Sequence, residues 1–228
     1  EYVRVPYADT GLTPIPDHVT DDNALFLGDI LSSGYFGAEL AEIQPGDTVA
    51  VIGAGPVGLC AAMCAGLFGA GDVILLDIDA HRLELAKRLG LATYTINPSA
   101  ESAEEAVRAL TQGRGADAVI EAAGGADTFQ TAWQIARPNS VVALVAMYEQ
   151  AQPFPLPNMY GKNLIFKTGG VDAVHCDRLM KLIACGKLNT DFLITHRAPL
   201  NDLMEGYHVF GGKQEHCLKW AVTPPVNK

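Results

Sequence analysis

Residues 47–62, DTVAVIGAGPVGLCAA, constrain the fold more than any other part of the chain. A continuous apolar stretch runs directly into Gly53, Gly55 and Gly58, spaced G-x-G-x-x-G, and an apolar helical pattern follows. The spacing alone is a weak signal, but a strand before it and a helix after it are the context of a dinucleotide-binding turn. In such a turn the first glycine permits the tight bend, the second lets the backbone approach a pyrophosphate, and the third permits close helix–strand packing.

The helix that opens at this turn would offer unpaired backbone N–H groups and its positive dipole end to phosphates. Pro56 is compatible with its first turn, because the N–H that proline lacks would be unpaired there anyway. We therefore predict that the turn, with Pro56 and Val57, binds the pyrophosphate of a dinucleotide. The alternative is a glycine-rich turn that serves packing alone.

The same alternation of strand and helix continues along the chain. Uninterrupted runs rich in Val, Ile and Leu alternate with amphipathic helical patterns, which indicates a parallel sheet covered on both faces. The sequence therefore predicts an α/β fold with a doubly wound parallel sheet, the Rossmann type. The expected strands are 47–55, 72–79, 92–97, 115–124, 140–148 and 163–170, and the expected helices are 56–68, 80–90, 102–112 and 127–136.

The two flanks of the chain do not continue this alternation. We predict a dinucleotide-binding domain over residues 33–171, with residues 1–32 and 172–228 folding together as parts of a second domain. The expected elements of the flanks are a strand at 1–10, helices at 177–186 and 200–210, and a strand at 217–222. Because the first residue is Glu1 and a strand pattern is already under way there, we expect the chain to be the later part of a longer protein.

The second expected strand carries an acid where a dinucleotide site needs one. Asp77 lies 19 residues after Gly58, close to the ~20-residue spacing of the acid that binds the ribose hydroxyls of NAD. A carboxylate there also repels the additional phosphate of NADP, although Arg82 could pair with it. We predict NAD as the cofactor, with Asp77, Ile78 and Arg82 at its adenosine end and Asp79 capping the next helix.

Composition excludes several classes of partner. The formal net charge is -10 and the pI is near 4.9, which argues against nucleic acid and anionic membrane surfaces, since both require clustered cations. No apolar run reaches the ~18 residues of a membrane span. The five cysteines form no close C-x-x-C pair, so we expect reduced thiols and a cytoplasmic protein.

Several motifs, in order, resemble those of the zinc-dependent medium-chain alcohol dehydrogenases, and the resemblance covers essentially all 228 residues. Within that family, DILSSGYFGAE and THRAPL look most like glutathione-independent formaldehyde dehydrogenases and bacterial secondary-alcohol dehydrogenases. The resemblance implies flanks that belong to a GroES-like catalytic domain. It also implies an NAD- and zinc-dependent oxidoreductase that interconverts a small alcohol with an aldehyde or ketone, as a homodimer or homotetramer paired at the sixth strand. The motifs are EYVRVP with IPD, GDILSSGYFGAELAEIQPGDTVAVIGAGPVG, GADAVIEAAG and LITHRAPLNDLMEGYHVF.

Residues 23–40 read as an apolar helix with a carboxylate, Asp29, in its middle. From the residues alone we favour a carboxylate that reaches solvent or a backbone N–H, because charged groups are rarely buried unpaired. The resemblance implies instead that Asp29 is a ligand of the catalytic zinc, together with a cysteine and a histidine from a segment absent here. A catalytic zinc takes three protein ligands and keeps one position open, so this chain alone is expected to bind NAD with little or no turnover.

The resemblance also implies roles for other residues. Ser33 would lie beside the nicotinamide as a catalytic residue, and Lys219 would reach the pyrophosphate, although an exposed strand lysine is an equal alternative. Two further readings stay open: a zinc-free reductase of the same superfamily, and a dinucleotide-binding protein without catalysis. Of the remaining residues, Ala122 and Ala123 would flank the adenine, and Val145, Thr168, Gly169 and Gly170 would contact the nicotinamide amide.

Overall fold

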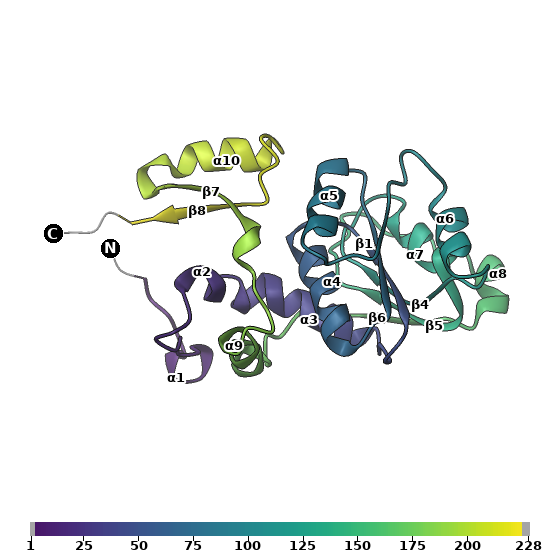
Figure 1. The fold of residues 1–228 in the computed structure, drawn as a ribbon, viewed down its shortest axis with the longest axis horizontal. Helices are drawn as coiled ribbons and strands as arrows, with labels where there is room; N and C mark the ends of the chain where they lie inside the picture. Colours follow the sequence, from purple (N-terminus) through teal and green to yellow (C-terminus); the bar gives the residue numbers. More distant parts are fainter. Residues whose placement is uncertain (1–2, 225–228) are drawn as a thin grey trace.

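The computed structural model describes residues 3–224 and consists of a larger lobe built on a sheet and a smaller lobe beside it (Figure 1). The sheet has six parallel strands in the order β3-β2-β1-β4-β5-β6. That order reverses direction between β1 and β4, as in dinucleotide-binding folds, and confirms the predicted fold class. The strands are β1 (Thr48–Ile52), β2 (Asp72–Leu76), β3 (Tyr94–Ile96), β4 (Ala116–Glu121), β5 (Ala136–Leu144) and β6 (Ile165–Thr168).

Helices cover both faces of the sheet, because successive strand residues point to opposite sides. In β1, Val49 and Val51 pack in the cluster that contains residues of α3, α4 and α5, whereas Ala50 and Ile52 pack with residues of α6 and α7. Figure 1 shows α4 and α5 on one side of the sheet and α6 and α7 on the other. These helices are α3 (Ser32–Leu40), α4 (Pro56–Phe68), α5 (Ala80–Arg88), α6 (Ala103–Leu110) and α7 (Thr128–Ile135).

Local sequence signals set the ends of these helices. Asp79 accepts hydrogen bonds from the backbone N–H groups of the first turn of α5, as predicted, and Ser102 caps α6 in the same way. Gly69 ends α4 at φ 100°, a conformation that glycine adopts without steric cost. The helices therefore begin and end within a few residues of their predicted bounds.

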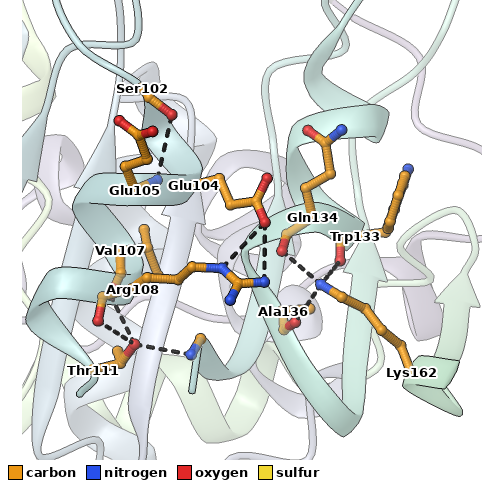
Figure 2. A network of polar contacts seen from close by, with 11 residues as sticks. Ser102, Glu104, Glu105, Val107, Arg108, Thr111, Trp133, Gln134, Ala136 and Lys162 are labelled. Atoms are coloured by element: carbon orange, nitrogen blue, oxygen red, sulfur yellow. Dashed lines mark hydrogen bonds and ion pairs between the residues drawn. The ribbon is translucent and has the colours of Figure 1, made fainter. Parts of the chain in front are cut away.

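Figure 2 shows two groups of polar contacts, one within α6 and its C-terminal turn and one between the end of α7 and the segment before β6. The Lys162 ammonium donates to the carbonyl oxygens of Trp133, Gln134 and Ala136, at 2.9, 2.6 and 2.9 Å. Carbonyls at the C-terminal end of a helix have no partner within the helix. Lys162 supplies that partner for α7 and fixes the chain that leads through α8 (Leu156–Met159) and η2 (Tyr160–Lys162) into β6.

The smaller lobe is built from both flanks of the chain. Its parallel two-stranded sheet pairs β7 (Ile194–Pro199) with β8 (Lys219–Thr223), and Figure 1 shows α10 alongside it. The final strand and both C-terminal helices were predicted, whereas β7 was not. The other elements are α1 (Ala8–Gly11), α2 (Asp21–Ala24), η1 (Leu27–Leu31), α9 (Cys176–Ala184), η3 (Asp191–Leu193), η4 (Leu200–Asp202) and α10 (Leu203–Gly211).

Two predictions for the N-terminal flank are wrong. The described part of the expected strand at 1–10 forms no strand: Tyr7 adopts φ 57° and precedes the short helix α1. The expected single helix over 23–40 is divided into α2, a π-helical turn η1 and α3. The three domain bounds stay a prediction. Within residues 3–224, no helix combines the length and apolar character needed to cross a membrane.

Candidate dinucleotide-binding site

The register of the sheet aligns the ends of five strands at one edge. Ile52 pairs with Leu76 on one side and Glu121 on the other, and the alignment continues to Leu144 and Thr168. The residue after each of these positions therefore lies on the same carboxyl edge of the sheet. Those residues are Gly53, Asp77, Ala122, Val145 and Gly169, all of them predicted site residues.

The glycine turn at this edge has the geometry that its sequence predicts. Gly53 adopts φ 100°, and a Cβ there would lie 3.0 Å from the Cβ of Ala123. A Cβ on Gly58 would lie 1.7 Å from the carbonyl oxygen of Gly53, so only glycine permits this approach. Gly55 is different, because a Cβ there would meet nothing nearer than Arg82 at 3.8 Å. The backbone at Gly55 is thus open on the side where a phosphate would bind, and Pro56 begins α4.

Asp77 connects the second strand to the glycine turn. Its two carboxylate oxygens accept hydrogen bonds from the backbone N–H of Ala54 at 2.5 Å and of Asp79 at 2.8 Å. Arg82, one turn into α5, pairs with the Asp79 carboxylate at 3.5 Å. Asp77 therefore holds the turn in place and keeps a negative charge at the strand end, while Arg82 supplies the opposite charge.

These elements enclose a cleft of about 690 Å³. Seven predicted site residues line it, and all belong to the pyrophosphate and adenosine half of the predicted site. The cleft is also lined by residues that the sequence analysis missed, from the loop after β3, from the first turn of α7 and from the smaller lobe. The predicted lining residues are Gly53, Gly55, Asp77, Ile78, Arg82, Ala122 and Ala123; the missed polar ones are Ser99, Asp127, Thr128, Thr131 and Lys213.

The residues predicted for the nicotinamide half do not line this cleft, but α3 brings several of them together. A Cβ on Gly37 would lie 2.9 Å from the Val145 side chain, and a Cβ on Gly169 would lie 3.3 Å from Phe36. Ser33, in the first turn of the same helix, is 7% exposed. Thr168 and Gly170 are exposed at the end of β6.

Asp29 lies in the π-helical turn η1, directly before α3. Its carboxylate is exposed, as the residues alone predicted, and it accepts a hydrogen bond from the Ser33 hydroxyl at 3.3 Å. Single π-helical turns are found frequently at functional sites. Among residues 3–224, however, no group of three His, Cys, Asp or Glu side chains is placed to hold a metal ion. The described residues therefore do not complete a zinc site, and Asp29 is at most one donor.

The structure places Lys219 away from the cleft. Its ammonium lies over the ring of Phe210, 5.2 Å from the centroid. Lys213, six residues earlier, lines the cleft instead. The sequence offers no local signal for Lys213, because it approaches the cleft from the other lobe.

Glu121 is a second residue that the sequence analysis missed as a site component. Its side chain is 0% exposed, and one carboxylate oxygen accepts hydrogen bonds from Ala123 N–H at 2.8 Å and Gly124 N–H at 2.9 Å. The other carboxylate oxygen has no hydrogen-bond partner among the described residues. Burial raises the pKa of the nearby Tyr148 phenol, and the Glu121 carboxylate raises it further. Glu121 thus fixes the turn that forms one wall of the cleft.

The fold and the glycine turn together define a dinucleotide-binding type of unit. A family model described as zinc-binding dehydrogenase matches residues 56–172. The chain belongs to this zinc-binding dehydrogenase family, in agreement with the resemblance to the zinc-dependent medium-chain alcohol dehydrogenases.

Three relatives illustrate the similarity. The chain is 37% identical to an alcohol dehydrogenase of Cupriavidus necator over 98% of its own length and 62% of that protein. It is 35% identical to an NADP-dependent isopropanol dehydrogenase of Thermoanaerobacter brockii, over 86% of the chain and 57% of that protein. The structure of alcohol dehydrogenase TADH from Thermus sp. ATN1 superimposes with a TM-score of 0.90 at 36% identity, covering 96% of this chain and 63% of that one. The chain thus spans about three fifths of the length of these relatives.

Proposed function

We propose that this chain is the cofactor-binding portion of an NAD- and zinc-dependent oxidoreductase that interconverts a small alcohol with an aldehyde or ketone. The observation that carries the proposal is the glycine turn at the carboxyl edge of the sheet. Gly58 leaves no room for a Cβ, whereas the backbone at Gly55 is open toward the cleft. That combination suits a bound pyrophosphate. The similarity to alcohol dehydrogenases supports the reaction class.

Each part of the site has a proposed task. The nicotinamide cofactor, when bound, accepts hydride from the alcohol carbon. The backbone of the glycine turn and the N-terminal end of α4 bind the pyrophosphate. The loop after Glu121 forms a wall for the adenine, while Val145 and Gly169 support the nicotinamide end beside α3. Ser33 orients the Asp29 carboxylate through the hydrogen bond that it donates.

NAD is the proposed cofactor rather than NADP. Asp77 lies at the end of β2 within the cleft, and its carboxylate is held by two backbone N–H groups. A fixed negative charge there favours ribose hydroxyls over a ribose phosphate. Arg82 favours the opposite choice, and the similar isopropanol dehydrogenase of T. brockii is named as NADP-dependent. Comparing the dissociation constants of NADH and NADPH decides the question, with tighter NADH binding expected.

Dinucleotide binding can be tested with a matched pair of glycine variants. Gly55→Val places a side chain between the turn and a bound phosphate, with room in the folded protein. Gly66→Val makes the same change in α4, where a Cβ would meet no neighbour within 4 Å. We expect NADH titrations to show binding to the parent protein and to Gly66→Val. In Gly55→Val the affinity for NADH should fall at least tenfold, about 1.4 kcal/mol. Equal binding by all three proteins would refute the proposed site.

The metal role of Asp29 requires a separate experiment. The intact mass of the purified native protein is measured first, followed by its zinc content and by alcohol-dependent NADH formation. We expect Asp29→Ala to lose zinc and activity while retaining NADH binding, because Asp29 lies outside the dinucleotide cleft. Unchanged zinc content in Asp29→Ala would exclude Asp29 as a ligand. An active protein without zinc would favour the zinc-free reductase. A protein that binds NADH without turnover would favour the non-catalytic alternative.

We further propose a cytoplasmic homodimer or homotetramer in which β6 pairs with its counterpart in a second copy. The strand lies last in the sheet, and Ile165 in it is 51% exposed. Tyr160 and Leu156, just before it, are 88% and 64% exposed. Light scattering is expected to give a multiple of the chain mass, and Ile165→Lys is expected to reduce it. All five cysteines are free thiols, as a reducing compartment would require.

A further inference from the structure

The cleft receives one cationic side chain from the smaller lobe. Lys213 belongs to the loop 212–218 between α10 and β8, yet it lines the same cleft as Asp77 and Arg82. Arg82 and Lys213 are the lysine and arginine residues among the described lining residues. They come from different lobes, so a ligand in the cleft would lie between a cation from each.

The backbone of this loop adopts a conformation that side chains disfavour. Lys213, Glu215 and His216 have φ angles of 51°, 51° and 54°. Residues other than glycine occupy this left-handed region at a cost in free energy. Three such residues within four positions persist only when contacts around the loop determine its shape.

Those contacts come from both lobes. The His216 ring stacks on the ring of His81, with centroids 3.9 Å apart and planes 14° apart. His81 belongs to the first turn of α5, the helix that also carries Arg82. On the other side, Glu215 pairs with His196 of β7 at 3.3 Å. The loop is thus attached to the helix that borders the cleft and to its own sheet.

The end of the loop is anchored in the core. Cys217 and Leu218 are 3% and 1% exposed, and Leu218 packs in the hydrophobic cluster that covers one face of the large sheet. The Leu218 N–H donates to the Thr195 hydroxyl at 3.0 Å. Lys213 lies at the opposite end of the loop from this anchor and lines the cleft.

We propose that Lys213 binds a phosphate group of the dinucleotide, and that the His81–His216 stack positions it. The inference rests on the proposed function and assigns to Lys213 the task that the sequence had suggested for Lys219. An ammonium group suits this task, because it presents three donors to phosphate oxygens without a fixed orientation. The phosphate is that of the pyrophosphate or, with NADP, of the ribose, and the two cofactors distinguish these sources.

The first test compares three lysine variants. Lys213→Gln, Lys219→Gln and Lys181→Gln each remove one positive charge, and Lys181 lies exposed on α9, outside the cleft. We expect Lys213→Gln to weaken binding by about fivefold, the size of one partly exposed charge-assisted contact, and Lys181→Gln to match the parent. If Lys213→Gln weakens the binding of both NADH and NADPH, Lys213 contacts the pyrophosphate. If it weakens the binding of NADPH alone, Lys213 contacts the ribose phosphate.

Adenosine is the control ligand for the phosphate contact. It lacks phosphate, so its affinity should be the same in Lys213→Gln and in the parent protein. A loss of NADH binding in Lys219→Gln but not in Lys213→Gln would overturn the inference in favour of the sequence-based role. The inference would also be overturned if Lys213→Gln bound NADH and NADPH as tightly as the control variant Lys181→Gln does. Absence of binding by the parent protein would instead refute the proposed function itself.

The second test separates positioning from general stability. His81→Ala removes the stack at a helical position without introducing backbone strain. We expect it to weaken NADH binding about threefold in the parent, consistent with a loss of Lys213 positioning, and to have no further effect in Lys213→Gln. An equal effect in both backgrounds would overturn the positioning role, because His81 would then act independently of Lys213.

Discussion

Replacing Lys162 with methionine tests whether a single ammonium group holds the end of α7. The side chain donates to three carbonyl oxygens, those of Trp133, Gln134 and Ala136 (Figure 2). Methionine retains the apolar stem of lysine and removes all three donors. The substitution therefore isolates the polar contribution from the packing contribution.

The magnitude follows from opposing contributions. A hydrogen bond from a charged group is worth about 1.5–3 kcal/mol, so three such bonds have a gross value of roughly 4–9 kcal/mol. Partial burial of the ammonium and the loss of about 2 kcal/mol of side-chain entropy oppose this gain. Because Lys162 is only partly buried, water can reach some of the carbonyls that methionine would leave unpaired. We expect a net loss of about 2–3 kcal/mol in the free energy of unfolding.

Thermal and urea denaturation measure this loss. For a domain of this size each kcal/mol lowers Tm by about 2–4 °C, so Lys162→Met should lower Tm by roughly 4–12 °C. Lys181→Met, which changes an exposed lysine of α9, should change the free energy of unfolding by less than about 0.5 kcal/mol. If the two variants had the same stability, the three carbonyl contacts would contribute nothing measurable and the reasoning would be refuted.

The pH dependence supplies an independent check. Burial lowers the pKa of Lys162 below its ordinary value of 10.5, and Arg108 lowers it further while Glu104 opposes the shift. Between the lowered pKa and 10.5 the unfolded chain binds a proton that the folded chain does not, so this group makes stability rise with pH in that window. The stability difference between the parent and Lys162→Met should therefore widen as pH approaches 10.5. A difference that narrows with rising pH would contradict the assigned cause.

Three further predictions concern the edge of the sheet and the core. Gly58→Ala should lower the free energy of unfolding by at least about 3 kcal/mol and abolish NADH binding, because the new Cβ would lie 1.7 Å from a carbonyl oxygen. An unchanged Tm would contradict this prediction. Glu121→Ala should lower the free energy of unfolding, measured by urea denaturation, by about 3–5 kcal/mol. Glu121→Gln keeps an acceptor for the two backbone N–H groups, so its loss should be less than half as large. Equal losses in the two variants would contradict this prediction. Burial raises the pKa of Cys60 to about 12 and that of Cys64 well above its usual range, so a thiol reagent at pH 8 should modify exposed Cys185 first and reach the buried pair only on unfolding.

The sequence predicted the large lobe well because its signals are local and mutually consistent. The central strands β1, β2 and β4 are short, mostly apolar runs, and their residue types alternate little because both faces are buried. Asp79 and Ser102 mark helix starts, and Gly69 marks a helix end. In such a sheet, strand order follows from the fold class once the glycine turn is located.

The N-terminal flank misled the same reasoning. Val3, Val5 and Tyr7 alternate as in a strand, but all three are exposed, and no described strand pairs with them. A strand is stabilised by hydrogen bonds and side-chain contacts to a neighbouring strand, so alternation is insufficient without a partner. The missed strand β7 shows the converse, because its polar sequence around His196 gives little strand signal and its pairing with β8 supplies the structure.

The site divides in the same way. The positions of Gly53, Gly55 and Asp77 at the cleft could be predicted because they depend on spacing along consecutive strands and turns of one βαβ unit. Lys213 could not, because its place in the cleft depends on how the two lobes pack. The role of Lys219 is implied by the family resemblance alone, and the structure places its ammonium over the ring of Phe210 instead.

Glu121 explains how the two halves of the site are kept in register. Its side chain fixes the backbone of Ala123 and Gly124, and Ala123 lines the cleft. Its main-chain oxygen accepts hydrogen bonds from Val145 N–H at 2.9 Å and Ala146 N–H at 3.2 Å, at the end of β5 where we propose that the nicotinamide binds. One fully buried residue thus connects both halves, and its position is set by the pairing of β4 with β1 and β5. The spacing of these two loops is therefore set by the pairing of β4 with its neighbouring strands.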